Sequence, residues 1–462
     1  MQYISTRGAA PVLEFEATMR AGLARDGGLY VPDHFPPLTQ VEIASLAGLS
    51  YEDQAAAIMR PFIGDSFTDD AFRALIGRAY AAFSHPARAP LKQLAANHFL
   101  LELFHGPTLA FKDFAMQLIG QLFEASLARS GGRVTIVGAT SGDTGSAAIE
   151  AFRGVANVDV FILYPHGRVS EVQRRQMTTP DDSNVHALAI DGDFDTCQAL
   201  VKDMFNDLAF RDAVGLAGVN SINWARVLAQ VVYFFSAAVS LGAPHRPVSF
   251  TVPTGNFGDI FAGYVARAMG LPIERLVIAT NHNDILHRAL SSGAYLPDGV
   301  KPSISPSMDI QVSSNFERAL FDAHGRDGRA VAQLMAELKG GGGFHISQGA
   351  LEFLREAFVS GRASEDETRA TIARIFQETG EVLCPHTAVG VHVAEGFVSA
   401  TPMITLATAH PAKFPDAVEA AIGARPGLPA HMADLFERPE RVARLPNDLG
   451  AVQAHIRAAG AA

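Results

Sequence analysis

The stretch His105-Gly-Pro-Thr-Leu-Ala-Phe-Lys112-Asp-Phe-Ala-Met116 joins two elements that the hydrophobic pattern predicts. Before it, residues 99–104 are apolar and favour a buried strand. After it, the spacing of apolar residues predicts a helix that lasts to about Arg129. Pro107 and Thr108 are typical of a helix start. We therefore expect a strand, a short turn and a helix, with Lys112 near the beginning of the helix.

Lys112 falls on the apolar face of this predicted helix. A lysine withdrawn from water loses solvation of its charged form, so its pKa falls and a neutral, nucleophilic amine becomes available. Such an amine is a candidate for a Schiff base with a carbonyl cofactor. The alternative is a lysine whose ammonium group extends to the surface. The apolar face also carries Met116, Ile119 and Phe123, and a polar stripe carries Asp113, Gln117, Gln121 and Glu124.

Composition restricts the class of protein. The chain has 462 residues, of which 48% are hydrophobic and 18% charged, as in globular enzymes of two or three domains. A net charge of −11 without a long basic run argues against nucleic-acid and membrane partners. Cys197 and Cys384 are too few for a disulfide framework or a zinc cluster, so we predict no metal and a cytoplasmic location. Residues 227–243 are too short for a membrane span and predict a buried helix.

Strand and helix patterns divide the chain into three predicted parts. Residues 1–90 favour a mostly helical N-terminal domain, which ends in a proline-containing boundary. Residues 91–424 alternate strands with helices, which predicts parallel sheets in an open α/β architecture. Residues 425–462 predict a helical tail. The main predicted strands are 133–137, 158–164, 185–190, 248–252, 275–280 and 403–407, and the helices between them include 144–152, 170–177, 194–205, 225–240 and 260–269.

Ligands of open α/β folds bind beyond the carboxyl ends of the strands, and the loop Gly138–Ser146 follows a predicted strand there. Its glycines and hydroxyl groups at a helix start suit a carboxylate or a phosphate, although an ordinary capped turn is the alternative. Its spacing matches neither a Walker loop nor a dinucleotide fingerprint. The candidate ligand residues are Thr140, Ser141, Gly142, Thr144 and Gly145.

Three further loops have polar residues in positions that suit a ligand. The amides of 255–258, in Pro253–Asp259, could bind a phosphate at a helix start. Asn220–Arg226 carries groups that could bind an oxyanion. The alternative interpretation is an ordinary helix cap followed by a solvated arginine. Thr408 follows the last strand, where a strand-ending turn explains it equally well. Pyridoxal 5'-phosphate would satisfy both the lysine, through its aldehyde, and a phosphate loop, which leaves the remaining sites for an anionic substrate.

Eight motifs together resemble one enzyme family. HGPTLAFKDFA, GATSGDTG, NSINWAR, PTGNFGD and TAHPAKF occur in this order, YISTRG and DGGLYVP precede them, and CPHTAVG lies before the last. From Tyr3 to Lys413 the chain resembles threonine synthase of the longer type. The resemblance implies the tryptophan-synthase-β-like fold (fold type II) of pyridoxal-phosphate enzymes, with two α/β sheet domains in 91–424 and an added N-terminal domain. It also implies conversion of O-phospho-L-homoserine and water to L-threonine and phosphate, in a monomer or weak dimer.

The resemblance also implies roles for individual residues. Lys112 would bind the cofactor covalently, and Thr408 would meet its pyridine nitrogen. An ionised Asp143 close to the phenolic oxygen of the cofactor would be repelled, so we expect its carboxyl to be turned away, protonated or bridged by water. The cofactor phosphate would lie on Gly255, Asn256, Phe257, Gly258 and Asp259, the substrate carboxylate on Thr140, Ser141, Gly142, Thr144 and Gly145, and the substrate phosphate on Asn220, Ser221 and Arg226.

Two other functions stay open from the sequence. A pyridoxal-phosphate-dependent dehydratase or phospho-lyase, acting on a related hydroxy or phospho amino acid, would release ammonia and a keto acid. A hydroxy-amino-acid dehydratase would have no substrate phosphate for Arg226 to bind, which argues against that form of the alternative. A binding protein that has lost its chemistry would not need Lys112.

Overall fold

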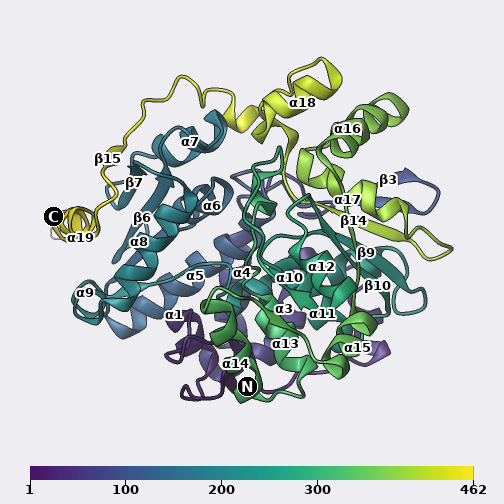
Figure 1. Cartoon of the computed structure of the whole chain (residues 1–462), viewed down its shortest axis with the longest axis horizontal. Helices are drawn as coiled ribbons and strands as arrows, with labels where there is room; N and C mark the ends of the chain where they lie inside the picture. The colour runs from purple at the N-terminus through teal and green to yellow at the C-terminus, as the bar shows by residue number, and fades with distance from the viewer. Residues whose placement is uncertain (461–462) are drawn as a thin grey trace.

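Two open sheets, side by side in Figure 1, organise the chain, and the computed structural model describes residues 1–460. In the larger sheet the neighbouring strands are parallel, except that its edge strand β3 is antiparallel to β4. Its order is β13 (Val359–Arg362), β10 (Ile273–Thr280), β9 (Val248–Pro253), β14 (Met403–Ala407), β4 (His98–Glu102) and β3 (Leu91–Ala95).

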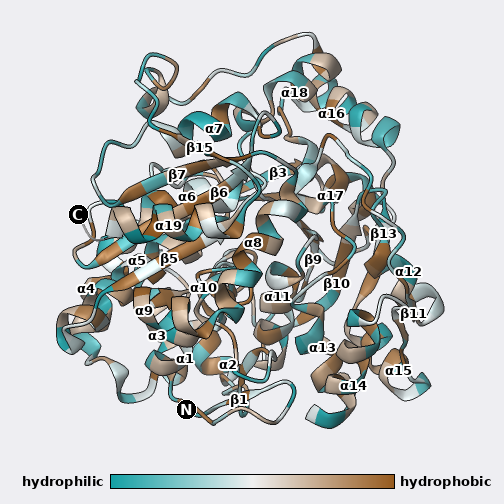
Figure 2. Cartoon of the chain, turned by 60° about the vertical axis from the view of Figure 1, so that its left-hand side comes forward, coloured by the Kyte–Doolittle hydropathy of each residue, from teal (hydrophilic) through white to brown (hydrophobic). Residues whose placement is uncertain are grey.

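The smaller sheet is parallel throughout. Its order is β15 (Ala443–Leu445), β7 (Val185–Ile190), β6 (Val158–Pro165), β5 (Val134–Ala139) and β8 (Leu216–Ala217). All eight residues of β6 are buried, because helices cover both faces of such a sheet. Figure 2 shows β5, β6 and β7 drawn largely in the hydrophobic colour. The predicted open α/β architecture is confirmed.

Helices connect the strands of both sheets. One of them, α10, is hydrophobic on nearly all sides and therefore buried, as predicted for residues 227–243. No helix in the described part of the chain is long and apolar enough to cross a membrane. The helices are α5 (Lys112–Ser130), α6 (Asp143–Phe152), α7 (Glu171–Thr178), α8 (Phe194–Asn206), α9 (Leu208–Val214), α10 (Trp224–Ser240), α11 (Gly258–Ala268), α12 (Ile285–Ser292), α13 (Phe316–Ala323), α14 (Gly328–Lys339), α15 (Gln348–Ala357), α16 (Glu365–Thr379), α17 (Pro385–Glu395), α18 (Pro415–Ile422) and α19 (Leu449–Gly460).

The N-terminal region is mostly helical, as expected. It contains β1 (Tyr3–Ser5), β2 (Tyr30–Pro32), α1 (Phe15–Ala21), α2 (Gln40–Ser45), α3 (Tyr51–Ile63) and α4 (Asp69–Tyr80). Its helix α3 packs against α10, and α4 packs against α5. These contacts join the N-terminal region to the core between the two sheets.

The predicted start of α5 is wrong by several residues. The helix begins at Lys112, and the turn before it is closed by Asp113, whose carboxylate accepts hydrogen bonds from Thr108 N (2.8 Å) and Oγ1 (2.6 Å). Within the predicted polar stripe Asp113 is fully buried, whereas Glu124 is exposed. Burial raises the pKa of Asp113 to about 6. A short polar side chain that bonds to its own turn explains the difference.

The C-terminal segment is more than the helical tail that the sequence predicts. It crosses from α18 to the smaller sheet (Figure 1), where β15 pairs in parallel with the edge strand β7. Helix α19 then buries Val452 and Ile456 against a hydrophobic cluster that includes Leu188 and Leu200. The segment therefore completes the smaller sheet, while the predicted domain boundaries at 90 and 424 stay predictions.

Substitution of Ile456 by Ala tests this packing. The side chain is 1% exposed, so its truncation should leave a cavity and destabilise the protein by about 2–5 kcal/mol, measured by chemical denaturation. Ala454→Ser, at an exposed position of the same helix, should leave the unfolding midpoint nearly unchanged. Equal midpoints for the two variants would show that α19 does not contribute to the core.

Candidate active site

Loops at the carboxyl ends of strands from both sheets meet at Lys112. The segment before α5 lies beside the loop after β14, because Phe111 N donates to Thr408 O (2.9 Å) and Ala110 forms an antiparallel bridge with Ala409. Asp143, after β5, lies opposite Lys112. Its Oδ2 is 3.5 Å from Lys112 Nζ. The structure thus brings the lysine, Thr408 and the first glycine-rich loop together.

Lys112 is buried but not in a purely apolar setting. Its side chain is 11% exposed and lies beside the ionised Asp143. Burial lowers the pKa of Lys112, and the Asp143 carboxylate only partly opposes this effect. The alternative of a lysine whose ammonium group extends to the surface is therefore wrong. Near neutral pH, a larger share of the Lys112 amine is neutral than for a lysine in water.

Asp143 is ionised because a second lysine neutralises it. Lys413 is completely buried, its Nζ is 3.0 Å from Asp143 Oδ1, and the same Nζ donates to Thr108 O (2.7 Å). Although burial favours the protonated carboxyl, the positive charges of Lys413 and Lys112 hold the pKa of Asp143 below its usual range. Gln173 Nε2 also donates to Oδ1 (2.9 Å). No local pattern predicts that Lys413 pairs with Asp143, because the two residues lie far apart in the chain.

The loop Gly138–Ser146 has the geometry of an anion site. Some of its residues shape the loop, and others offer backbone amides to a ligand. Thr140 Oγ1 accepts hydrogen bonds from the amides of Gly142 and Gly145, both at 2.9 Å, so this hydroxyl shapes the loop. Gly142 has φ 138°, and a Cβ there would lie 2.3 Å from the Gln173 side chain. The amides of Ser141 and Thr144 have no acceptor within residues 1–460, which leaves them available to a ligand.

The loop between β9 and α11 presents a set of free amides. The N–H groups of 255–258 donate to no acceptor in the part of the chain that the structure describes, and they lie at the start of α11. Phe257 has φ 64°, a strained conformation that turns the chain into the helix. A Cβ on Gly255 would lie 2.6 Å from Ser307 O. Free amides at a helix start fit a phosphate group.

Asp259, at the second position of α11, is a buried carboxyl. One of its oxygens accepts a hydrogen bond from the Tyr233 hydroxyl, and Oδ2 has no partner among the described residues. Burial raises the pKa of Asp259 to about 7, in spite of the Tyr233 hydrogen bond. The carboxyl can therefore carry a proton near neutral pH, which reduces its repulsion of an anion in this loop.

Arg226 is a buried cation without a carboxylate partner in residues 1–460. Its Nη1 donates to Val219 O (3.2 Å), and its Nε has no partner. Burial lowers the pKa of Arg226 to about 10, which still leaves the guanidinium charged. An unpaired buried charge is costly, so this site fits an anionic ligand. The half-buried Asn220 and Ser221 lie in the loop that leads into Arg226.

Asn315 joins two of the predicted anion loops. Its Nδ2 donates to Asn256 O (2.8 Å) in the loop after β9 and to Ser221 O (3.2 Å) in the loop before α10. The buried Arg318 holds the Asn315 side-chain oxygen and donates to Ile222 O (2.6 Å). Neither residue belongs to a motif that we singled out, because their contacts lie far away in the sequence.

His386 and Ser307 complete the site, and sequence reasoning assigned no role to either. Ser307 N donates to His386 Nε2 (3.1 Å), and Ser307 Oγ lies 3.4 Å from Asp143 Oδ2. Burial lowers the pKa of His386 to about 4, so the ring is neutral. Its Nδ1 has no partner in the described chain. The motif CPHTAVG, which contains His386, was the only available signal.

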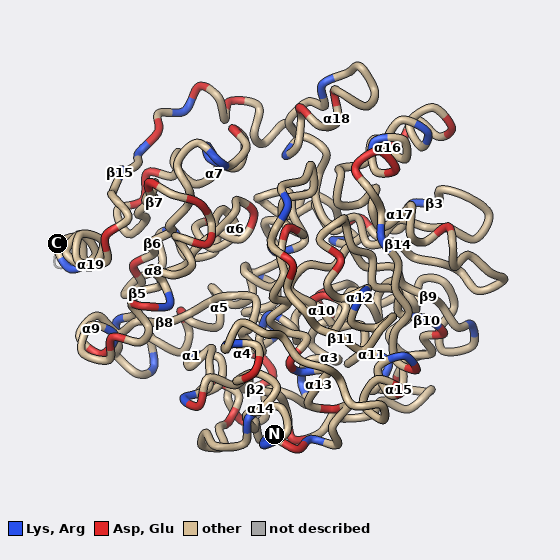
Figure 3. Tube along the Cα trace, in the orientation of Figure 1, with Lys and Arg blue, Asp and Glu red and all other residues tan. Residues whose placement is uncertain are grey.

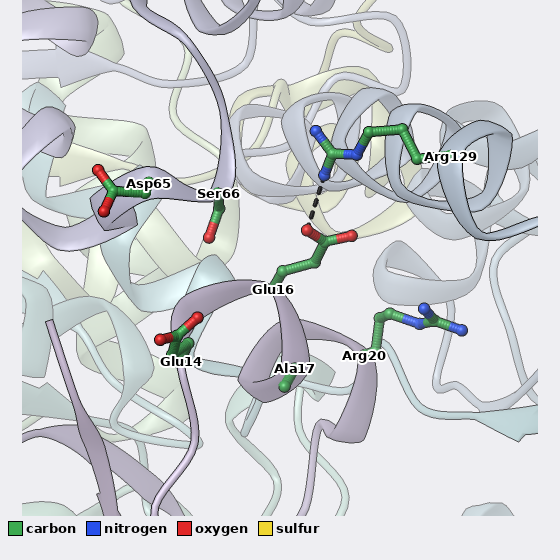
Figure 4. A pocket seen from close by; sticks show the side chains of 7 residues that line it. All are labelled: Glu14, Glu16, Ala17, Arg20, Asp65, Ser66 and Arg129. Carbon is green, nitrogen blue, oxygen red and sulfur yellow. Dashed lines mark hydrogen bonds and ion pairs between the residues drawn. The ribbon is translucent and has the colours of Figure 1, made fainter.

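A surface cavity lies near the other end of α5. It measures about 590 Å³ and is drawn in Figure 4, where Arg129 pairs with Glu16. Arg129 and Lys112 are at opposite ends of α5, a helix of 19 residues that is about 28 Å long. None of the charged residues that line this cavity is buried, so it lacks the unpaired buried groups found around Lys112. We therefore place the site at Lys112.

Two open α/β sheets, with a mostly buried lysine and a loop of free amides at a helix start between them, match the class of pyridoxal-phosphate-dependent enzymes of fold type II. A family model described as pyridoxal-phosphate dependent enzyme matches residues 84–337. Two others, threonine synthase N terminus and threonine synthase C-terminal, match residues 2–80 and 387–456.

Individual relatives agree with these matches. A threonine synthase of Pseudomonas aeruginosa is 57% identical over 99% of this chain and 98% of its own length. The crystal structure of pyridoxal-phosphate-bound threonine synthase from Brucella melitensis is 59% identical and covers 100% of both chains, with a TM-score of 0.97. Yeast threonine synthase is 41% identical, with a TM-score of 0.93 over 100% of this chain and 99% of its own. The chain belongs to the threonine synthase family.

Asn315→Ala tests the link between the two anion loops. Removal of the amide leaves Ser221 O without its donor and Asn256 O with only the backbone N–H of residue 315. Both loops should therefore loosen, and backbone hydrogen exchange should accelerate at the two amides that donate into them, residue 223 (to Asn220 O) and residue 315 (to Asn256 O). Asn97→Ala is a matched control, since the Asn97 amide also bridges two carbonyls, Ser399 O and Ala400 O. That control should affect only its own loop. Faster exchange in one anion loop alone would show that Asn315 does not couple them.

Proposed function

We propose that the chain converts O-phospho-L-homoserine and water to L-threonine and phosphate, with Lys112 as the residue that binds pyridoxal 5'-phosphate. One observation supports this most strongly. Three buried polar atoms without partners in residues 1–460 surround the lysine: Arg226 Nε, Asp259 Oδ2 and His386 Nδ1. Buried polar atoms normally have partners, so this concentration indicates a site that ligands complete.

The residues of the site suit the cofactor. The free amides of 255–258 would bind its phosphate, and the protonated form of Asp259 would lie beside that phosphate without repulsion. The Thr408 hydroxyl would face the pyridine nitrogen, where a neutral group favours a neutral ring. When bound, the cofactor would supply the electron sink for the reaction.

Lys112 would transfer the protons. Its amine would take the proton from the substrate Cα, because burial disfavours the charged form of the amine. The amides of Ser141 and Thr144 would hold the substrate carboxylate. This contact fixes the orientation of the substrate, so that Cα and then Cβ can lose their protons before phosphate leaves from Cγ. A proton then returns to Cγ, water adds its hydroxyl to Cβ while its remaining proton goes to phosphate, and Cα regains its proton.

Arg226 would stabilise the leaving phosphate, together with Asn220 and Ser221. Its guanidinium lies in a buried setting where electrostatic interactions are strong, and no carboxylate of the described chain competes for it. The same observation argues against a hydroxy-amino-acid dehydratase, whose substrate offers no phosphate. A phospho-lyase would use Arg226 equally well, and its products, ammonia and a keto acid, distinguish it.

We further propose that the enzyme works in the cytoplasm as a monomer or weak dimer, without a nucleic-acid or membrane partner. Both cysteines are buried free thiols. The net charge is −11. Figure 3 shows acidic and basic residues interspersed along the trace. A net negative charge, with basic residues interspersed among acidic ones, does not favour the binding of polyanions.

The reaction itself gives the first test. The cofactor-loaded protein, mixed with O-phospho-L-homoserine, should release threonine and phosphate in equal amounts, whereas ammonia and a keto acid would support the phospho-lyase. Lys112→Ala should reduce turnover by at least about 10³-fold, since it removes the proton-transferring amine, and leave the circular dichroism spectrum unchanged. Substantial turnover by this variant would contradict the assignment of Lys112.

Arg226→Met separates ligand binding from folding. Loss of charge-assisted hydrogen bonds to the phosphate should lower kcat/KM by about 10–100-fold and weaken inhibition by inorganic phosphate. The ligand-free variant should nevertheless melt at a higher temperature, because an unpaired buried charge has been replaced by an apolar side chain. Cofactor affinity should change little. A parallel loss of cofactor affinity and substrate use would overturn the assignment of Arg226 to the substrate phosphate.

A further inference from the structure

Lys413 belongs to a line of three buried charges that ends at Lys112. Its Nζ lies 3.0 Å from Asp143 Oδ1, and the other oxygen of Asp143 lies 3.5 Å from Lys112 Nζ. Lys413 has 0% exposure, and its ammonium is fixed further by Thr108 O at 2.7 Å. The carbonyl of Thr108 also accepts from Gln176 Nε2 (3.1 Å), so both partners of Lys413 are held in place.

Charged and titratable groups from several other elements also face Lys112. Arg226 on α10 adds a second positive charge that disfavours protonation of Lys112, and Asp259 on α11 adds a carboxyl that is partly neutral near pH 7. His386 on α17 is neutral. Asp143 is therefore the group that favours the ammonium form of Lys112 most directly. How strongly Asp143 does so depends on which other cations interact with its carboxylate.

We propose that Lys413 is a positioning residue, which keeps Asp143 ionised and fixed beside Lys112 and thereby sets how tightly Lys112 holds its proton. The inference rests on the proposed role of Lys112 in proton transfer. With Lys413 present, the carboxylate is shared between two ammonium groups. Lys112 can then lose its proton and leave behind a neutral pair, Lys413 with Asp143.

Removal of Lys413 would change this balance in a defined direction. The deprotonation of Lys112 would then leave an uncompensated buried carboxylate, so Lys112 should keep its proton to higher pH. Removal of Asp143 instead leaves two neighbouring ammonium groups, so Lys112 should lose its proton at lower pH. Removal of both charges should bring the titration of Lys112 back towards that of the parent protein. A purely structural ion pair would not produce opposite shifts.

The experiment follows the protonation of Lys112 directly. The full-length, cofactor-free protein is labelled with ¹³C at the lysine ε-carbons, and the Lys112 signal, assigned by its loss in Lys112→Arg, is titrated with pH. We expect Lys413→Met to shift the midpoint upwards by at least one pH unit and Asp143→Asn to shift it downwards. The double variant should lie within about half a unit of the parent. The rate at which the cofactor-free protein captures pyridoxal 5'-phosphate should shift with pH in the same directions.

Controls keep the test decisive. Lys92→Met removes a half-exposed lysine that pairs with Glu381, and it should leave the Lys112 midpoint unchanged. If Lys413→Met does not fold, Asp143→Asn is compared with the double variant, where loss of the Lys413 charge should raise the midpoint. An unchanged midpoint in either comparison overturns the proposal. Failure of the parent protein to form threonine would overturn the proposed function alone, because the titration needs neither substrate nor turnover.

Discussion

A single buried carboxylate, Asp143, holds the two halves of the molecule in register at the site. It follows a strand of the smaller sheet, whereas both lysines that contact it, Lys112 and Lys413, follow strands of the larger sheet. Burial of three charges is costly, and only their mutual attraction and the hydrogen bonds from Gln173 and to Thr108 compensate for it. The lysine amine can therefore be poised for chemistry only when both sheets have formed and met.

The anion loops depend on a different kind of constraint, which is geometric. Gly142 and Gly255 stand where a Cβ would meet neighbouring atoms at 2.3 and 2.6 Å, so the loops can approach Gln173 and Ser307 only as glycines. Asn315 then ties the loop after β9 to the loop before α10 through two carbonyl groups. Backbone amides held in this way bind an anion without reorganisation, which preserves the binding free energy for orientation of the substrate.

Local patterns explain what could be predicted. Hydrophobic periodicity predicts the long strands β5, β6, β7, β9, β10 and β14 and the helices α6, α7, α8, α10 and α11, and the motif loops lie at the ends of those strands. The short strands β8, β11, β12 and β13 were not predicted. The pairing of Lys413 with Thr108, 305 residues apart, and the edge strand β15 could not be derived in this way. Periodicity reports which face of an element is buried, not which distant residue it meets. The wrong start predicted for α5 has a related origin, because the hydrogen bonds between Thr108 and Asp113 hold the preceding residues in a turn.

Three buried cations differ in how far the chain itself satisfies their hydrogen bonds and charge. Arg318 donates to backbone carbonyls of Tyr30 and Ile222, and Lys413 has its carboxylate, so both are satisfied within the chain. Arg226 has one carbonyl and an unpaired Nε. All three would bear a similar cost of burial, yet only Arg226 is left to recover it from outside the described chain. The unsatisfied charge therefore supports the ligand site that we propose at Arg226, whereas the two satisfied charges belong to the structure around it.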